Sequence, residues 1–330
     1  MSKKRIAING FGRIGRLTFR NLIKNDNVEI VAINDLTDNG TLAQLLKFDS
    51  AHGRFDGTVE YNDTHLIVNG QKIIASAIRN PEELPWAENN VDYVLECTGI
   101  FRNKEGAGKH ITAGAKKVLI SAPGKGDGIK TVVLGVNGDT MTGEETIISN
   151  ASCTTNCLAP VVKVIHDNWG FVQGSLTTTH AYTGDQNIID APHSDLRRAR
   201  SAAINIIPTS TGAANAVGKV IPEVEGKMFA IAIRVPVVTG SMIELNVIVD
   251  KEVSKEEINA KFKEYADGPM AGILEYSTDP LVSSDIVGNP YSSIFDSELT
   301  DVKGKMIKIV SWYDNEAGYS ARLADLLLMI

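Results

Sequence analysis

The chain has 330 residues, of which 43% are hydrophobic and 22% are charged, and its formal net charge is −7. This length allows two domains or one large α/β unit. The negative net charge, with Lys and Arg interspersed among Asp and Glu, gives no support to nucleic-acid binding. No apolar run is long enough to span a membrane, and three cysteines do not make a disulfide framework, so we expect a cytoplasmic protein with reduced thiols and no membrane association.

The first segment has the pattern of a dinucleotide-binding unit. An apolar strand over residues 5–9 runs directly into a glycine-rich turn, G-x-G-x-x-G, formed by Gly10, Gly12 and Gly15. A helical pattern follows, and a second apolar strand leads to Asp35. Such a turn lets a pyrophosphate approach backbone N–H groups, while the acidic side chain binds ribose hydroxyls and repels a 2′-phosphate. The sequence therefore predicts a Rossmann domain that binds NAD in preference to NADP.

Further strands at residues 93–97 and 117–121 alternate with a helix at residues 104–112, which predicts an open parallel sheet. Arg79 and Ser121 lie near predicted strand ends, where such sheets bind ligands. A solvent-exposed surface arginine is an alternative explanation for Arg79.

A cysteine-containing stretch, S-N-A-S-C-T-T-N-C-L-A at residues 149–159, joins a short strand to a helix that is expected to begin near Cys157. Cys153 is thus placed at a helix N-terminus, where unpaired backbone N–H groups and the macrodipole favour the nucleophilic thiolate. A buried cysteine beside an ordinary helix cap explains the same pattern equally well. Cys97, in an apolar strand, is expected to be a small core residue. Zinc is not expected, because no second Cys or His pair completes four ligands.

The second half is rich in strands. They are expected at residues 174–179, 229–235 and 241–249. One helix with a capping box is expected between Val249 and Phe262. Long strand runs with few helices predict a second, α+β domain on a mixed or antiparallel sheet, with the boundary near residue 150. A last helix, at residues 316–330, is expected to pack an apolar face.

Two groups of residues in this half are suited to chemistry. A neutral histidine near Cys153 would act as its general base. His180 is preferred among the six histidines because it ends a strand, although spacing alone does not select it. The other group offers guanidinium, hydroxyl and backbone N–H donors to anions: Arg198, Arg234, Thr211 and Gly212.

Four stretches that span the chain resemble phosphorylating glyceraldehyde-3-phosphate dehydrogenases of the bacterial glycolytic type. They are residues 8–16, 149–157, 195–200 and 312–316. The resemblance implies an NAD-binding domain over residues 1–150, onto which the helix at residues 316–330 packs, and a catalytic domain over residues 151–315. It also implies a homotetramer, in which the loop at residues 181–203 reaches a neighbouring subunit's cofactor region.

Position by position, the resemblance implies that Cys153 is the nucleophile and His180 its activating base. Cofactor binding falls on the glycine turn and on six further residues: Arg13 and Ile14 under the pyrophosphate, Asp35 at the adenosine ribose, Arg79 and Ser121 along the cofactor, and Asn315 at the nicotinamide carboxamide. Inorganic phosphate would bind Ser152, Thr154, Thr211 and Gly212. The substrate's own phosphate would bind Thr183 and Arg234, with Arg198 between the two anion sites.

The implied reaction is the NAD-dependent oxidation of glyceraldehyde 3-phosphate in the presence of inorganic phosphate, through a hemithioacetal and a thioester on Cys153. One departure from the family's pattern is Ala191-Pro192, where many NAD-specific members have a larger apolar residue before the proline; this weakens the exclusion of NADP. Two alternatives remain: an erythrose-4-phosphate dehydrogenase of the same architecture, and a dinucleotide-binding partner protein without catalysis.

Overall fold

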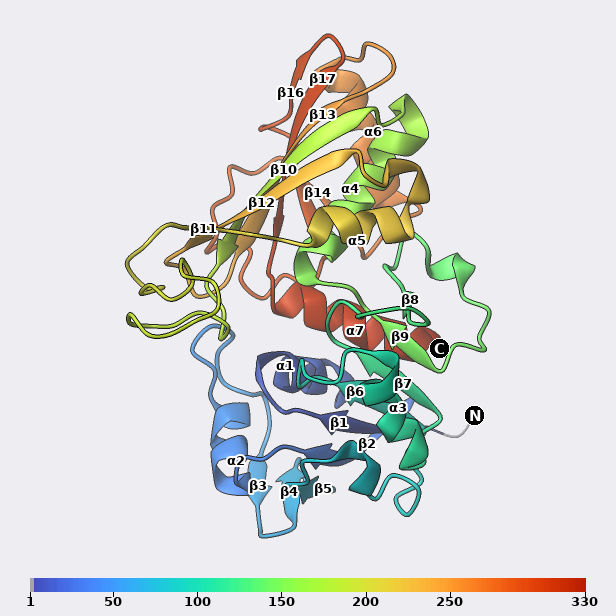
Figure 1. The fold of residues 1–330 in the computed structure, drawn as a ribbon, viewed down its shortest axis with the longest axis vertical. Coiled ribbons are helices and arrows are strands. Elements are labelled where there is room, and N and C mark those ends of the chain that lie inside the picture. Colours follow the sequence, from blue (N-terminus) through green and yellow to red (C-terminus); the bar gives the residue numbers. More distant parts are fainter. Residues whose placement is uncertain (1–2) are drawn as a thin grey trace. The chain divides into compact units, whose positions relative to one another are not determined.

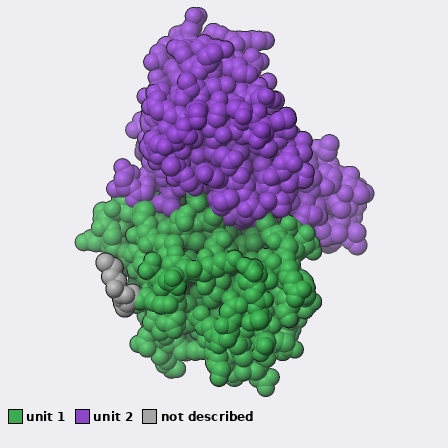
Figure 2. Space-filling model, turned by 180° about the vertical axis from the view of Figure 1, so that it is seen from behind, with its two compact units in different colours: residues 1–132, 140–151, 320–330 green, residues 133–139, 152–319 purple. Residues whose placement is uncertain are grey.

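The computed structural model describes residues 3–330 and divides the chain into two compact units (Figure 2). The first unit contains the residues up to 132, residues 140–151 and residues 320–330. The second unit contains residues 133–139 and residues 152–319. No helix among residues 3–330 is both long and apolar enough to cross a membrane.

The first unit is built on a nine-stranded sheet (Figure 1). Its strands are β1 (Lys4–Asn9), β2 (Val28–Asn34), β3 (Val59–Tyr61), β4 (His65–Val68), β5 (Gln71–Ser76), β6 (Tyr93–Glu96), β7 (Lys117–Ile120), β8 (Lys130–Thr131) and β9 (Ile147–Ser149). Their order is β3-β4-β5-β2-β1-β6-β7-β9-β8. Every pair from β5 to β8 in this order is parallel, whereas β3, β4 and β5 pair antiparallel. The predicted parallel sheet is confirmed.

The helices of this unit confirm the α/β prediction. They are α1 (Arg13–Leu22), α2 (Asn39–Lys47) and α3 (Lys104–Thr112), with a 3-10 turn η1 (Pro81–Glu83). A second 3-10 turn, η2 (Gly138–Thr140), lies where the polypeptide returns from the second unit to the first. Strand β1 pairs with β2 on one side and with β6 on the other, so the strand order reverses beside β1. In a Rossmann-type sheet, ligands bind at the carboxyl ends of the strands at this reversal.

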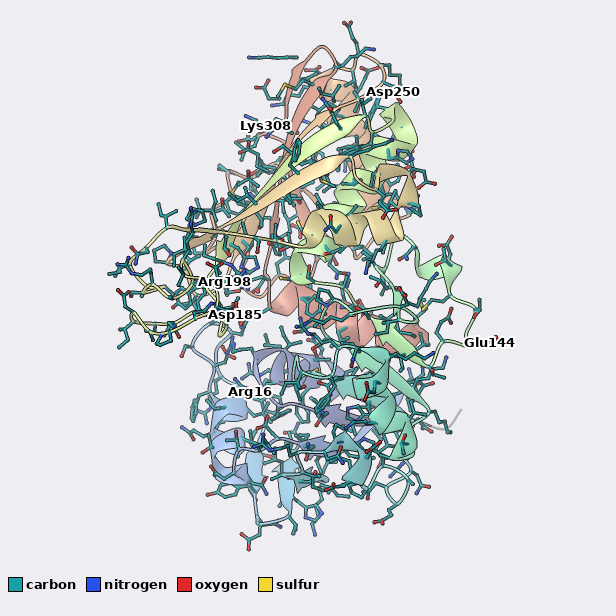
Figure 3. All side chains as sticks on the ribbon, viewed as in Figure 1. Arg16, Glu144, Asp185, Arg198, Asp250 and Lys308 are labelled. Carbon is teal, nitrogen blue, oxygen red and sulfur yellow. The ribbon has the colours of Figure 1, made fainter. Side chains whose placement is uncertain are left out.

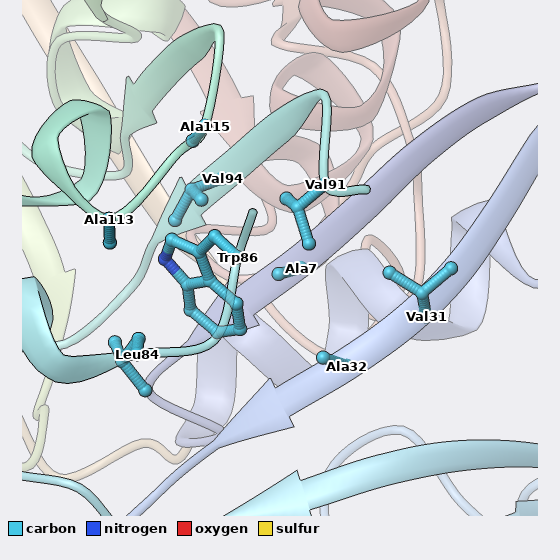
Figure 4. Close-up of a cluster of buried hydrophobic side chains, with 9 residues drawn as sticks. All are labelled: Ala7, Val31, Ala32, Leu84, Trp86, Val91, Val94, Ala113 and Ala115. Carbon is cyan, nitrogen blue, oxygen red and sulfur yellow. The ribbon is translucent and has the colours of Figure 1, made fainter. Parts of the chain in front are cut away.

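A buried apolar cluster supports one side of this sheet, and Figure 4 shows its side chains around the indole of Trp86. Trp86 is fully buried, and its indole N–H donates to Nδ1 of His110 over 3.0 Å. The members contributed by β1, β2 and β6 are apolar because that face of the sheet is covered: Ala7, Val31, Ala32 and Val94.

The last residues of the chain also belong to the first unit. Helix α7 (Ala317–Met329) confirms the predicted C-terminal helix, and residues 320–330 lie in the first unit. The Lys4 ammonium group donates to the carbonyls of Leu327 and Leu328 over 3.0 and 2.9 Å. The Tyr93 hydroxyl donates to the carbonyl of Ile330 over 3.2 Å. These bonds join the final turn of α7 to β1 and β6.

The second unit is built on an eight-stranded sheet. Its strands are β10 (Gln173–Ala181), β11 (Ile207–Thr209), β12 (Met228–Val235), β13 (Ser241–Ile248), β14 (Leu274–Ser277), β15 (Ser293–Asp296), β16 (Asp301–Lys303) and β17 (Met306–Tyr313). Their order is β11-β12-β10-β13-β17-β15-β14, with β16 paired to β17. Strands β10 and β12 are parallel, as are β14 and β15, and the other pairs are antiparallel. The predicted mixed sheet is confirmed.

The helices of the second unit are α4 (Cys153–Trp169), α5 (Ala213–Val220) and α6 (Lys255–Asp267), with a 3-10 turn η3 (Pro222–Val224). Helix α4 begins four residues before the predicted start, because the Ser152 hydroxyl accepts the backbone N–H of Thr155 and caps the helix there. The capping box of α6, between Ser254 and Glu257, is confirmed. Strand β10 continues one residue past His180, which therefore lies inside the strand and not at its end.

Candidate active site

Cys153 is the first residue of α4, and its sulfur faces a histidine. The distance between Cys153 Sγ and His180 Nε2 is 3.4 Å. His180 is 4% exposed, while Cys153 retains partial exposure. The structure thus brings together the two residues that the sequence could only nominate separately.

A backbone carbonyl fixes the tautomer of the His180 ring. Nδ1 of His180 lies 2.7 Å from the carbonyl oxygen of Ala181. A carbonyl oxygen only accepts, so Nδ1 carries the proton and donates. Nε2 is then unprotonated and can accept the proton of the Cys153 thiol.

Arg234 lies beside His180 because of strand register. The two residues are directly paired on the parallel strands β10 and β12. Arg234 Nη1 donates to the same Ala181 carbonyl over 3.0 Å and lies 3.0 Å from Nδ1 of His180. Because Nδ1 is protonated, the contact between Nδ1 and Arg234 Nη1 is not a hydrogen bond. Both nitrogens are donors that share the Ala181 carbonyl oxygen as their acceptor. This fixed guanidinium adds a positive charge next to the ring.

The environment shifts the pKa of both central groups. Burial, followed by the charge of Arg234, lowers the pKa of His180 to about 3, so the ring is neutral. Burial raises the pKa of the Cys153 thiol, and Arg234 opposes that rise. The backbone N–H groups of Cys153 and Thr154 at the helix N-terminus do lower the pKa of this thiol, as expected, but desolvation outweighs them and the net pKa is raised.

The other two cysteines are less suited to ionisation. Burial raises the pKa of Cys157 to about 12, and its sulfur lies 3.5 Å from the hydroxyl of Ser293. Burial also raises the pKa of Cys97 to about 12. No arginine lowers the pKa of either of these cysteines, whereas Arg234 lowers the pKa of Cys153. All three cysteines are free thiols.

Tyr313, at the end of β17, links the helix that carries Cys153 to the strand that carries His180. Its hydroxyl lies 2.9 Å from the hydroxyl of Thr154 and 2.9 Å from that of Thr178. Its ring packs edge-on against the His180 ring, with centroids 5.8 Å apart and an interplanar angle of 76°. No sequence pattern predicts a role for Tyr313; its only signal is its position in the stretch 312–316.

Asn315 is held by a serine next to the histidine strand. The Ser241 hydroxyl accepts the backbone N–H of Ala181 over 3.1 Å and donates to Asn315 Oδ1 over 2.8 Å. Both side chains are buried. Because Oδ1 of Asn315 is taken by Ser241, its Nδ2 group is left as a donor for a ligand. Ser241 is a second residue that the sequence analysis missed.

The residues suited to anions form a neighbouring group in the second unit. Arg198 donates to Asp185, to the Thr209 hydroxyl over 3.0 Å and to the Ser210 carbonyl over 3.3 Å. Figure 3 shows Asp185 and Arg198 next to each other on the loop that follows β10. The charge of Arg198 also lowers the pKa of His180, so this guanidinium lies within electrostatic reach of the Cys153–His180 pair.

Three further candidates for anion binding lie on loops or helix ends. Gly212 is the N-terminal cap of α5 and offers no side-chain cap of its own. The Thr211 hydroxyl accepts the N–H of Ala213 over 3.3 Å. Thr183 lies two residues after β10 and is partly exposed. Their donors lie on the same unit as Cys153, and the roles of these residues stay predictions.

The first unit contains a pocket of about 390 Å³ at the strand-order reversal. Its lining includes Gly10, Gly12, Asp35 and Arg79. The Asp35 carboxylate accepts the N–H of Phe11 over 2.7 Å and that of Thr37 over 3.0 Å, one on each oxygen. Each oxygen keeps a lone pair that can accept a ribose hydroxyl. This donor-and-acceptor set fits a dinucleotide.

The glycine turn of this pocket shows why glycine is needed at two positions. Gly10 has φ +91°, and a Cβ there would lie 2.7 Å from the backbone N of Thr98. A Cβ on Gly15 would lie 2.2 Å from the carbonyl oxygen of Gly10. Arg13 and Ile14, which follow on the first turn of α1, present backbone N–H groups at its N-terminus. Arg13 also forms an ion pair with Asp49.

The interpretation of Cys97 as a simple core residue is wrong, because the structure places it just after β6 in the lining of this pocket. Ser121 follows β7; its N–H donates to the Glu96 carbonyl over 3.0 Å, and its side chain bonds to Cys97. Ser121 thus contacts Cys97, which lines the pocket, but does not line the pocket itself. Beneath them the buried Glu96 carboxylate accepts from Asn9 over 2.6 Å and from His110 over 3.0 Å, a network that the sequence analysis missed.

Metal binding has no support in the described part of the chain, since no three His, Cys, Asp or Glu residues among residues 3–330 form a cluster that could hold an ion.

Comparison with known proteins decides the family. Residues 152–315 match the C-terminal domain of glyceraldehyde 3-phosphate dehydrogenase, and residues 4–104 match the NAD-binding domain of that enzyme. The chain belongs to the glyceraldehyde 3-phosphate dehydrogenase family. Residues 4–104 are accordingly the NAD-binding domain of a member of this family, and the predictions of family, Rossmann-type fold and NAD as cofactor are confirmed.

Members of this family from several bacteria are similar to the chain over nearly their whole length. The glyceraldehyde-3-phosphate dehydrogenase of Thermotoga maritima is 58% identical over 329 residues, which cover 99% of this chain and 98% of the relative. That of Geobacillus stearothermophilus is 55% identical over 328 residues, with the same coverage. That of Kitasatospora aureofaciens is 54% identical over 328 residues, again with 99% and 98% coverage.

Proposed function

We propose that the chain catalyses the NAD-dependent oxidation and phosphorylation of D-glyceraldehyde 3-phosphate to 1,3-bisphosphoglycerate in glycolysis. The observation that carries this proposal is the 3.4 Å contact between Cys153 Sγ and the unprotonated Nε2 of His180. A nucleophile in contact with its base, and a base oriented by a third group, are what covalent catalysis requires. Family membership supplies the substrate.

The first half-reaction is an oxidation on sulfur. Cys153 Sγ bonds to the aldehyde carbon, and its proton passes through His180 Nε2 to the aldehyde oxygen, which gives a hemithioacetal. His180 then removes the hydroxyl proton again while a hydride leaves the carbon, and a thioester remains. When bound, NAD supplies the acceptor for this hydride. The neutral state of His180, which follows from its lowered pKa, keeps Nε2 available as the base.

The second half-reaction transfers the acyl group. Hydrogen phosphate attacks the thioester carbon, the C–S bond breaks, and the proton of the phosphate ends on the Cys153 sulfur as the thiol is restored. The proton that His180 took from the hemithioacetal is then released to solvent, which is the one proton that the overall reaction yields. The backbone N–H of Cys153 and protonated His180 stabilise the oxyanion that forms on the carbonyl oxygen. A thioester is reactive enough for this transfer, which explains why the nucleophile is cysteine.

The substrate roles follow the geometry of the second unit. Thr183 and Arg234 are proposed to hold the phosphate of the substrate, with Arg198 between the anion sites. Inorganic phosphate is proposed to bind at Ser152, Thr154, Thr211 and Gly212. Arg234 supports this assignment because its guanidinium lies next to His180 and so places an anion within reach of the reacting carbon.

The proposed cofactor roles fall on residues of the first unit, except for Asn315, which belongs to the second unit. Gly10, Gly12 and Gly15 shape the turn, and the N-terminal N–H groups of α1, at Arg13 and Ile14, are proposed to bind the pyrophosphate. Asp35 is proposed to accept the hydroxyls of the adenosine ribose, which favours NAD over NADP. Arg79 and Ser121 are proposed to flank the cofactor. Asn315 is proposed to bind the nicotinamide carboxamide through the Nδ2 donor that Ser241 leaves available.

A homotetramer in the cytoplasm is proposed as the working form. Large apolar side chains are exposed on the strands of the second unit and on the loop between β10 and β11: Phe229, Ile231, Met306, Ile189, Leu196, Ile204 and Ile206. Exposed apolar groups of this size are typical of subunit contacts. Multi-angle light scattering would measure a mass of four chains, and a monomeric mass would contradict this part of the proposal.

The test of the proposed function is NADH formation from glyceraldehyde 3-phosphate, with inorganic phosphate omitted and then restored. We expect sustained turnover only with phosphate. Erythrose 4-phosphate, assayed in parallel, should be the poorer substrate; the reverse preference would favour the alternative dehydrogenase. Turnover that ignores phosphate would contradict the thioester-transfer step.

A pair of cysteine variants isolates the nucleophile. Cys153→Ser should lower turnover by at least about 10³-fold while NAD binding is retained. Cys157→Ser, four residues further on the same helix, is the matched control and should retain both turnover and stoichiometric labelling by iodoacetamide. Normal turnover in Cys153→Ser would contradict the assignment of Cys153 as the nucleophile.

A further inference from the structure

Three hydroxyl groups and one carbonyl form a continuous hydrogen-bonded chain beside Cys153. The Thr154 hydroxyl lies 2.9 Å from the Tyr313 hydroxyl, which lies 2.9 Å from the Thr178 hydroxyl. The Thr178 hydroxyl donates to the carbonyl of Met242 over 3.1 Å. Thr154, Thr178 and Tyr313 are 5%, 1% and 1% exposed, so water does not compete for these bonds along most of the chain.

The Met242 carbonyl sets the direction in which every hydroxyl of this hydrogen-bonded chain donates. A carbonyl oxygen accepts but cannot donate, so the single proton of Thr178 is used toward Met242. The contact between Tyr313 and Thr178 then requires Tyr313 to donate. The contact between Thr154 and Tyr313 in turn requires Thr154 to donate. Only this direction satisfies all three contacts, and it requires the side-chain hydrogen bond between Thr154 and Cys153 to run from the thiol to the Thr154 oxygen.

Each residue of this hydrogen-bonded chain lies in a helix or a strand. Thr154 is the second residue of α4, and the others lie on strands β10, β13 and β17. These strands are neighbours in the order β10-β13-β17. Burial raises the pKa of Tyr313 well above its ordinary value, so its hydroxyl keeps its proton. The direction of the chain is therefore a stable property of the fold.

We propose that Tyr313 engages the only proton of Thr154, so that Thr154 faces an incoming anion as a hydrogen-bond acceptor, and that the site consequently selects an oxyanion that carries a proton. This inference rests on the proposed function, which places inorganic phosphate at Thr154. Hydrogen phosphate has one P–O–H group to donate to Thr154. Sulfate has the same shape and charge but carries no proton at neutral pH. It therefore has no donor for Thr154, and its oxygens face the lone pairs of the Thr154 hydroxyl without a hydrogen bond.

The same contact orients the attacking phosphate. With its P–O–H group held at Thr154, the unprotonated oxygens of hydrogen phosphate are free to face the thioester on Cys153, the neighbouring residue. Tyr313 touches neither substrate nor sulfur in this scheme; it is a positioning residue that acts through Thr154. Its effect is therefore expected on anion selectivity more than on the oxidation of the aldehyde.

The test compares sulfate with phosphate in wild-type protein and in Tyr313→Phe, which retains the ring that packs against His180. The measured quantity is the inhibition constant of sulfate divided by the KM of phosphate. Release of the Thr154 proton should let that hydroxyl donate to either anion, so we expect this ratio to fall by about tenfold. Protection of Cys153 from iodoacetamide by sulfate gives a second readout that needs no turnover, and it should strengthen in the variant.

Further variants keep the proposal falsifiable. Thr178→Val removes the acceptor of Tyr313, whose proton can then turn to Thr154; the ratio should fall in the same direction. Thr154→Val removes the acceptor itself and should raise the KM of phosphate. Tyr276→Phe removes a tyrosine hydroxyl elsewhere on the same sheet and should leave the ratio unchanged; a fall there equal to that in Tyr313→Phe would overturn the proposal.

The outcomes separate this proposal from the function on which it rests. An unchanged ratio in both Tyr313→Phe and Thr178→Val, with phosphate-dependent turnover intact, would overturn the proposal alone. Turnover of the wild-type protein without phosphate would overturn the proposed function and this inference with it. A fall of the ratio in both variants, with Tyr276→Phe like wild type, supports the inference.

Discussion

His180 and Arg234 occupy directly paired positions on two neighbouring parallel strands, and both side chains donate to the carbonyl oxygen of Ala181. One carbonyl thus sets the tautomer of the base and the position of the guanidinium beside it. Arg234 lowers the pKa of His180 and opposes the rise in the pKa of Cys153. Arg234 therefore helps to keep His180, the proposed base, neutral and eases ionisation of Cys153, the proposed nucleophile.

Replacement of Arg234 by Gln should make the Cys153 thiol harder to ionise, because the largest charge that opposes its desolvation is removed. We expect alkylation by iodoacetamide at neutral pH to slow several-fold and its pH profile to move to higher pH. Arg234→Lys keeps a positive charge and should shift the profile less. A profile identical to that of wild type in Arg234→Gln would show that Arg234 does not act on the thiol.

Two glycines of the nucleotide turn should respond to the same substitution in different ways. Gly15→Ala places a Cβ 2.2 Å from the Gly10 carbonyl and should destabilise the protein by about 2–3 kcal/mol. Gly12→Ala meets no atom within 4 Å, so it should cost about 1 kcal/mol or less while weakening NAD binding through the approach of the pyrophosphate. Urea unfolding without NAD and a calorimetric NAD titration measure the two effects. Equal losses of stability would contradict this division.

Burial of neutral His180 should make stability depend on pH in the acid range. Its pKa is lowered from 6.5 to about 3 in the folded protein, so the unfolded chain binds the extra proton between these values. The stabilising contribution is complete above about pH 6.5 and is lost as pH falls toward 3. The slope attributable to this group is at most about 1.4 kcal/mol per pH unit.

His180→Asn is the comparison that isolates this contribution, since asparagine can donate to the Ala181 carbonyl and does not titrate. The unfolding free energies of wild type and variant should run parallel above pH 6.5. Below that pH the wild-type value should fall more steeply. Curves that stay parallel down to pH 4 would rule out the lowered pKa of His180.

Ser241→Ala should weaken NAD binding through Asn315. Loss of the hydroxyl removes the 2.8 Å bond to Oδ1 of Asn315 and leaves only the longer, 3.4 Å bond from the Thr239 hydroxyl, so the amide is held less firmly. We expect about a 3- to 10-fold loss of affinity for NAD. ADP-ribose, which lacks the nicotinamide, is the matched ligand and should bind the variant as it binds wild type. An equal loss for both ligands would place the effect outside the carboxamide contact.

Local patterns were sufficient to predict most elements. The glycine turn, the helix at residues 104–112 and the capping box at Ser254 depend on neighbours a few residues apart, and each is confirmed. Helix α4 was predicted too short because Ser152, and not a residue near Cys157, caps it. Cys97 was misjudged because a strand pattern does not show that the strand ends at Glu96 and that the next residue lines a pocket.

The site itself depends on pairings that a sequence does not display. Arg234 reaches His180 only because β12 lies parallel to β10 in one particular register. Tyr313 reaches Thr154 across 159 positions of the chain, and Ser241 reaches Asn315 across 74. Residue types in these stretches indicated hydroxyl, amide and cationic chemistry, but their partners follow from strand order. For this reason Tyr313 and Ser241 carried no predicted role.

The bonds from Lys4 to the carbonyls of Leu327 and Leu328 have a consequence for biosynthesis. A ribosome releases the first unit's opening strand before the second unit and residues 320–330 after it. Lys4 of the nucleotide-binding unit therefore lacks its two carbonyl acceptors while more than half of the chain is translated. The first unit is therefore completed only after the second unit has been translated.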